Sequence, residues 1–212
     1  MRWRFNWYRQ ITKDRILKLL VPDEIPPNIP FDIPRQLPDI AIMERPKQEY
    51  NFELFDLESL YNLVPGHYHN LSDLAPGNIP VISCGDANNG ISGYYHVQNP
   101  LYKNKLTIAF NGMNTLTTKY HPYTFSAKDD VAICLPNREI RLTTELFIQV
   151  MLNRERWRYS YYRKCFINKL RHYQVFLPAK DWHIHEDIIQ RITETTPYWN
   201  YIESCLNWSN RN

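Results

Sequence analysis

A series of short runs rich in β-branched and aromatic residues constrains the fold of this chain most strongly. Runs of this kind, separated by turn residues, are typical of β-strands. Two of the intervening turns contain Asn-Gly pairs, in which Asn and Gly accept positive φ at little cost. We therefore predict strands at residues 81–83, 93–97, 106–110, 123–126 and 131–135, with turns at Asn88-Asn89-Gly90 and Asn111-Gly112.

Two helical patterns follow the strands. Apolar residues recur at helical spacing at Leu146, Phe147, Val150 and Met151, and Thr143 precedes them as a candidate N-cap. A last helix is expected to start near Asp181, with Ile184, Ile188 and Ile192 on one face, and to end before Pro197. We therefore expect an α+β fold, in which a twisted mixed β-sheet is followed by helices.

The segment before this body differs in composition. Residues 1–22 are basic and aromatic and favour a short helix, whereas seven prolines lie between Pro22 and Pro46. Because proline fixes φ and lacks an N–H group, the second stretch is predicted to be an extended arm. We expect four parts: a basic N-terminal segment at residues 1–22, a Pro-rich arm at 23–49, the main domain at 50–180 and a helical segment at 181–212.

An internal repeat links the two basic segments. The eight residues from Trp3 to Gln10 align with those from Trp157 to Lys164, with four identical and an offset of 154 (157 − 3). On this interpretation residues 1–22 are the tail of a preceding domain, and the chain is half of a two-domain protein. The alternative is a chance match in a chain rich in Trp and Tyr.

Positive charge is concentrated rather than high overall, since the net charge is only +3 for 212 residues. Residues 1–18 contain six Arg or Lys against Asp14, and residues 154–171 contain seven against Glu155. Basic segments interleaved with aromatic residues indicate contact with a polyanion. The alternative for either segment alone is an ordinary solvated surface.

Several classes of protein are not supported by the sequence. The N-terminus has no apolar core of a signal peptide, and no window approaches the roughly 18 apolar residues of a membrane span. The four cysteines are far apart, which favours a reducing cytoplasm over a disulfide framework or a zinc site. Phosphate-binding glycine loops and the Asp/Glu-x-Lys pattern of many nucleases are both missing. We expect a cytoplasmic protein with no catalytic centre, no cofactor and no metal.

The residue types suited to reading DNA lie in the turns and in the basic segment. Asn can pair with adenine edges, and Arg or Lys can contact guanine or phosphate. The alternative is that the Asn-Gly pairs only make turns and that the tyrosines pack in the core. The candidate DNA-binding residues are Asn88, Asn89, Gly90, Tyr94, Asn111, Met113, Asn114, Thr115, Lys119, Tyr120, Arg154, Arg158, Tyr161, Arg163 and Lys164.

The order of these motifs resembles a known family. Gly77-Asn78-Ile79-Pro80, followed by Asn88-Asn89-Gly90-Ile91-Ser92-Gly93-Tyr94, is similar to the opening of target-recognition domains in restriction–modification specificity subunits. The resemblance is to type I and related bifunctional type II systems, and it extends over roughly residues 52–192. It continues through Leu106-Thr107-Ile108-Ala109-Phe110-Asn111-Gly112, Tyr120-x-Pro122, Leu177-Pro178 and Asp181-Trp182.

The resemblance implies a non-catalytic protein that binds double-stranded DNA and chooses the target sequence. Subunits of this family carry two such domains in a pseudo-twofold arrangement and dock methyltransferase and nuclease subunits. This chain has one domain, so two copies could pair as a homodimer to restore the twofold. Two rival hypotheses remain: a regulatory module that docks on restriction–modification subunits without reading DNA, and a nuclease or methyltransferase with an unrecognised site.

Overall fold

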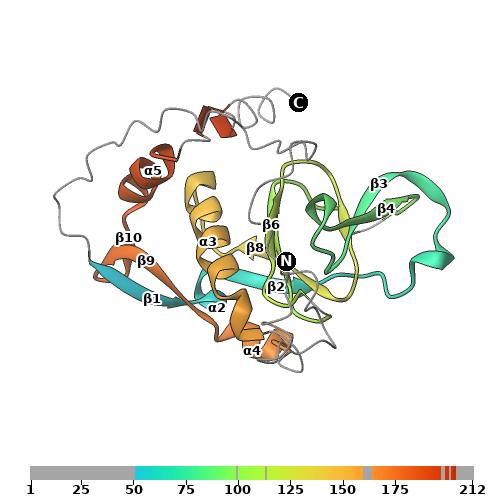
Figure 1. Ribbon diagram of the computed structural model, residues 1–212, viewed down its shortest axis with the longest axis horizontal. Helices are drawn as coiled ribbons and strands as arrows, with labels where there is room; N and C mark the ends of the chain where they lie inside the picture. Colours follow the sequence, from blue (N-terminus) through green and yellow to red (C-terminus); the bar gives the residue numbers. More distant parts are fainter. Residues whose placement is uncertain are drawn as a thin grey trace, which may run out of the picture. The chain divides into compact units, whose positions relative to one another are not determined.

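Two of the predicted strands, at residues 106–110 and 131–135, form the middle of a four-stranded antiparallel sheet in the order β2-β8-β5-β6, whereas its two edge strands were not predicted (Figure 1). The structure is a computed structural model that describes residues 51–98, 100–112, 114–159, 164–196, 199–200 and 202–203, all within the unit Met43–Asn212. Strands β5 and β8 are buried on both faces over most of their length, which explains their mainly apolar sequences. The strands are β2 (Tyr61–Pro65), β5 (Lys105–Ala109), β6 (Thr118–His121) and β8 (Val131–Pro136).

A second sheet, in the order β4-β3-β7, presents the Asn-Asn-Gly turn. Strands β3 (Pro76–Ile82) and β4 (Ile91–Tyr95) are antiparallel, and β7 (Ser126–Ala127) pairs with β3 in parallel. A small core containing Ile82, Phe125 and Ile133 joins this sheet to the four-stranded sheet. The turn is thereby held on a packed support.

The third sheet, β1-β9-β10, joins the two ends of the described region. Strand β1 (Phe52–Asp56) pairs antiparallel with β9 (Gln174–Lys180), which also pairs with β10 (His183–Ile184). The largest core cluster includes Phe55, Ile148 and Leu177 and so connects this sheet with the helices. The α-helices are α2 (Leu57–Leu60), α3 (Leu142–Arg154), α4 (Ile167–Arg171) and α5 (Glu186–Glu194), and the short 3-10 turns are η2 (Leu71–Asp73), η3 (Asn88–Gly90) and η4 (Arg156–Tyr159).

The predicted α+β class is confirmed, but three elements differ from the sequence-based prediction. The strand expected at residues 123–126 is reduced to β7, because Pro122 ends β6 and Phe125 forms only an isolated bridge with Tyr102. The helix expected from Asp181 starts at Glu186 instead, since Asp181 and Trp182 have φ of 51° and 62° and Ile184 belongs to β10. Positive φ is incompatible with a right-handed helix.

Helix α3 also differs from its prediction. Thr143 is not a cap: the helix begins at Leu142 after Arg141, and Thr143 is buried inside it. The side that faces the core carries Ile148 and Leu152, whereas Val150 from the predicted apolar face is 56% exposed. Leu146, Phe147 and Val150 instead line a groove of about 640 Å³ together with Ile192 of α5, which lies beside α3 (Figure 1). Helix α3 therefore has apolar residues on both sides.

The expectations for residues 1–50 lie outside the described residues. These are the basic N-terminal helix, the Pro-rich arm and the first copy of the internal repeat. The predicted domain boundaries consequently remain predictions. None of the helices in the described part is long and apolar enough to cross a membrane.

Candidate nucleic-acid interface

The Asn88–Gly90 turn adopts a left-handed backbone throughout, as the Asn-Asn-Gly sequence predicted. Asn88, Asn89 and Gly90 have φ of 48°, 51° and 80°. Asn tolerates this conformation better than most residues, and Gly adopts it without strain. A Cβ at position 90 would also lie 3.0 Å from the carbonyl oxygen of Ser83, a tight contact that adds to the preference for glycine there.

The side chain of Asn89 fastens this turn to β6 and the residues after it. Its amide nitrogen lies 3.0 Å from both the Tyr120 carbonyl oxygen and the Tyr123 hydroxyl oxygen. The Tyr123 hydroxyl is in turn 3.1 Å from Nδ1 of His121. An amide donates to both oxygens, and the Tyr123 hydroxyl can then donate to the ring.

His121 is fully buried, and it continues this chain of hydrogen bonds into the sheet. Burial, together with the positive charge of Lys119, lowers the pKa of His121 to about 3. The ring is therefore neutral at pH 7. With Nδ1 accepting, its proton lies on Nε2, which donates to the hydroxyl of Thr107 at 2.8 Å. The turn is thus hydrogen-bonded through His121 to strand β5.

A second turn packs against the residues that precede the first. The amide of Asn114 donates to the Cys84 carbonyl oxygen at 3.0 Å, and the backbone N–H of Gly112 donates to the Asn111 side chain at 2.9 Å. Gly112 has φ of 84°, and a Cβ there would lie 2.6 Å from the sulfur of Cys84. Thr115 is buried and donates to the Gly112 carbonyl oxygen at 3.1 Å. The Asn111-Gly112 turn predicted from the sequence is confirmed.

Two basic side chains hold the loop between Ser83 and Asn88. The ammonium of Lys119, half-buried, donates to the Gly85 carbonyl oxygen, and burial lowers its pKa despite the opposing effect of Asp86. Arg156 forms an ion pair of 3.1 Å with Asp86. Lys119 and Arg156 therefore shape this loop as well as adding positive charge beside it.

The C-terminal end of α3 is tied to the same region. Asn153 and the backbone of Thr118 exchange two hydrogen bonds of 2.9 Å each, which joins α3 to β6. Arg154 lies exposed in the last turn of α3, and Arg158 pairs with Glu155 at 3.1 Å while staying 56% exposed. Residues that are distant in the sequence are thus brought together around the two turns.

Not every candidate is equally placed. Asn88 and Tyr94 are exposed, and Tyr94 is 55% accessible. Tyr120 is half-buried, and burial, aided by the negative charge of Glu145, raises its pKa to about 12. The ammonium of Lys164 lies 5.6 Å from the centre of the Phe166 ring. Met113, Tyr161 and Arg163 lie outside the described residues, and contact of any candidate with DNA stays a prediction.

Sequence reasoning missed several residues that organise this region. His121, Tyr123 and Asn153 make the links described above, and Asp86 and Arg156 form the ion pair across the loop. The orientation of His121 could have been predicted, because successive side chains in a strand point to opposite faces and His121 follows Tyr120. The Asp86–Arg156 pair joins residues 70 apart, and no local pattern predicts it.

The comparisons with known proteins agree with the family resemblance, although no protein-family model matches the chain. Among curated proteins it is similar to the specificity subunit S.BcgI of a type II restriction enzyme from Heyndrickxia coagulans. The two are 28% identical over 138 residues, which is 64% of this chain and 40% of the relative. The predicted non-catalytic role is supported by this similarity, because the relative is a specificity subunit.

Solved structures share the fold. The S subunit of a type I restriction–modification system from M. genitalium matches with a TM-score of 0.53 and 15% identity, over 76% of this chain and 41% of that one. The HsdS subunit of Thermoanaerobacter tengcongensis matches with a TM-score of 0.52 and 13% identity, over 79% and 42%. The chain spans about two fifths of the length of these relatives. It is therefore similar in sequence to a restriction-enzyme specificity subunit and has the target-recognition-domain fold of type I S subunits.

Proposed function

We propose that this chain reads double-stranded DNA sequence as a specificity component of a restriction–modification system, in the cytoplasm. In this role it directs a methyltransferase subunit, and in some assemblies a nuclease subunit, to a chosen site and catalyses no reaction itself. Since the chain spans about two fifths of its relatives, one copy would read one part of a split target, and two copies would form the complete reader.

One observation carries the proposal: the loops that bear the candidate residues are hydrogen-bonded to one another on a packed support. The Asn88–Gly90 turn is joined to β6 through Asn89, and the Asn111-Gly112 turn is joined to the preceding loop through Asn114. Protein donors and acceptors can distinguish one base edge from another only when the fold holds them in place. A rigid loop pair of this kind meets that requirement.

The nearby positive charge supports binding to the phosphate backbone. Arg154 and Arg158 are exposed at the end of α3, close to the loops that Arg156 contacts through Asp86. Such cations neutralise phosphates and release counterions, which makes binding salt-dependent but carries no sequence information. Affinity and specificity are thus assigned to different residues.

The test is selection of bound duplexes from a random pool by the full chain, alone and with a methyltransferase subunit encoded in the same genome. We expect one short sequence, or one half-site, to be enriched. Arg154→Ala should weaken binding to all sequences and lower the slope of log K against log salt by about one. Arg138→Ala is the matched control, because this exposed arginine lies beside β1 and β9 instead.

Two results would contradict the proposal. One is a pool that stays unenriched under both conditions. The other is equal salt slopes for the Arg154 and Arg138 variants, which would remove the basic end of α3 from the interface. Binding to a methyltransferase without any affinity for DNA would instead favour the regulatory alternative.

A further inference from the structure

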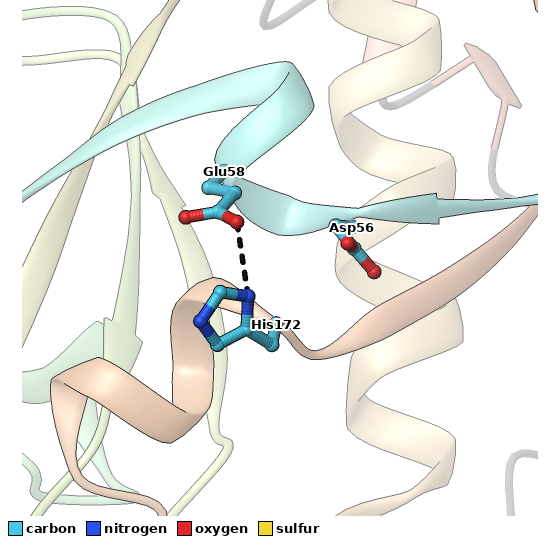
Figure 2. Close-up of side chains that lie close together, drawn as sticks. All are labelled: Asp56, Glu58 and His172. Carbon is cyan, nitrogen blue, oxygen red and sulfur yellow. Dashed lines mark ion pairs between the residues drawn. The ribbon is translucent and has the colours of Figure 1, made fainter.

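Three side chains with metal-ligand chemistry lie close together where β1, α2 and the end of α4 meet. These are Asp56, Glu58 and His172, and their ligand atoms all lie within 4.8 Å of one another. Figure 2 shows Glu58 and His172 facing each other, 2.9 Å apart between Oε1 and Nδ1, with Asp56 beside them. Within the described ranges, this is the one group of three or more His, Cys, Asp or Glu that meets this distance.

The backbone fixes this arrangement. The β1–β9 pairing ends at Asp56 opposite Gln174, and the next N–H, of Leu57, donates to the Tyr173 carbonyl oxygen at 2.9 Å. One step further along this antiparallel pair, Glu58 lies opposite His172. The hydrogen-bonded ladder therefore brings these two side chains together. The side-chain amide of Asn137 also donates to the Glu58 carbonyl oxygen at 2.8 Å.

The Asp56 side chain gives a second, independent indication. Asp56 is the N-cap residue of α2, a position where Asp usually accepts a hydrogen bond from the first turn of the helix. Its side chain makes no such bond here. The carboxylate instead lies within 4.8 Å of the ligand atoms of Glu58 and His172, where it can serve as a third ligand.

We propose that Asp56, Glu58 and His172 bind a divalent transition-metal ion of the Zn²⁺ type. One imidazole nitrogen and two carboxylates suit Zn²⁺, whereas Mg²⁺ and Ca²⁺ prefer oxygen ligands alone. Three protein ligands leave one position of a tetrahedral ion for water. Ligand atoms about 2 Å from such an ion lie roughly 3.3 Å apart. Ligand atoms of this group that lie farther apart must therefore approach each other by a small side-chain rotation, and none of the three residues is fully buried.

The bound ion would clip the end of α4 to the corner between β1 and α2. These two segments lie more than a hundred residues apart in the chain and are also held together by the β1–β9 ladder and by packing of α2 against α4. The site therefore stabilises the fold and is separate from DNA reading. It was not visible in the sequence because Glu58 and His172 are 114 residues apart (172 − 58).

The experiment is calorimetric titration of the full-length chain with ZnCl₂, together with thermal unfolding with and without the ion. Wild type should bind one more equivalent of Zn²⁺ than His172→Gln or Asp56→Asn. At a free concentration ten times the dissociation constant, the unfolding equilibrium constant should fall about elevenfold. MgCl₂ at the same concentration should give no shift.

A matched control is His69→Gln. His69 also pairs with a carboxylate, that of Asp129 at 2.5 Å, and is exposed, but it does not belong to a three-ligand group in the described part of the chain. This variant should bind as many equivalents as wild type. Equal stoichiometry for wild type and His172→Gln, or an equal loss in His69→Gln, would overturn the proposal. Because Zn²⁺ stoichiometry is measured without DNA, the result is independent of the proposed function.

Discussion

Two neighbouring asparagines allow the role of the Asn89 amide to be measured directly. Asn88 and Asn89 both have φ near 50°, and both are exposed as whole residues, but the Asn89 amide bonds to Tyr120 and Tyr123. Substituting each in turn by glycine keeps the left-handed backbone accessible. The two variants share the entropic cost of an added glycine, so their difference isolates the amide.

The expected difference follows from the hydrogen bonds that are lost. Asn89→Gly removes two donor contacts of 3.0 Å, and the buried ring of His121 loses the neighbour that orients the Tyr123 hydroxyl. A net hydrogen bond contributes about 0.5–1.5 kcal/mol, and partial exposure places these two near the lower end. Asn89→Gly should therefore be about 1–2 kcal/mol less stable than Asn88→Gly, a difference of roughly 2–8 °C in Tm for a domain of this size.

Thermal and urea unfolding of both variants, followed by far-ultraviolet circular dichroism, give the comparison. Near-equal stability of the two variants would refute the reasoning, because it would mean that the amide contributes nothing to the turn. A larger loss in Asn88→Gly would refute it more strongly. The urea m-value should be unchanged in both, since the surface exposed on unfolding is the same.

Three further predictions concern the core and its pH dependence, each measured by chemical unfolding. Burial raises the pKa of Glu145 to about 7, so the stabilisation by its protonated form is complete below pH 4.5 and is lost as pH rises through 7. The free energy of unfolding of Glu145→Gln should therefore rise by about 2 kcal/mol relative to that of wild type between pH 5 and 8. A difference that does not change with pH would contradict this. The pKa of His121 is lowered to about 3, so the stabilisation by its neutral ring is lost as pH drops below 6.5, and over that range wild type should lose stability relative to His121→Gln. Ile148→Ala should cost about 2–5 kcal/mol and Val150→Ala less than about 1 kcal/mol, because only Ile148 is buried; equal losses would place Val150 in a covered face.

Local chemistry made part of this fold predictable. The runs that form β5 and β8 are mainly apolar because both faces of these strands are buried over most of their length. The two Asn-Gly turns follow from the backbone preference of Asn and Gly, since Asn88, Asn89 and both glycines adopt positive φ. The candidate loops were therefore located from sequence, although their mutual hydrogen bonds were not.

Other parts depend on contacts that no short window contains. Strand β1 and strand β9 are paired across more than a hundred residues, and the exposed face of this pair carries the apolar side chains Phe52, Leu54 and Phe176. Helix α3 carries apolar residues on both sides, so periodicity could not tell which side faces the core. The predicted face was the one that lines the groove.

The candidate DNA-binding residues fall into two groups, those whose side chains bind other parts of the fold and those whose side chains face solvent. Asn89, Asn114 and Lys119 each donate to backbone carbonyl oxygens, so their polar groups are largely used in shaping the loops. Exposed Asn88 and Tyr94 lie on or beside the same turn and keep their side chains toward solvent. A residue type suited to reading a base is thus insufficient as evidence. A base edge is read by donors or acceptors that the fold has not already engaged. We therefore expect Asn88 and Tyr94 to be the first of the candidates to contact bases.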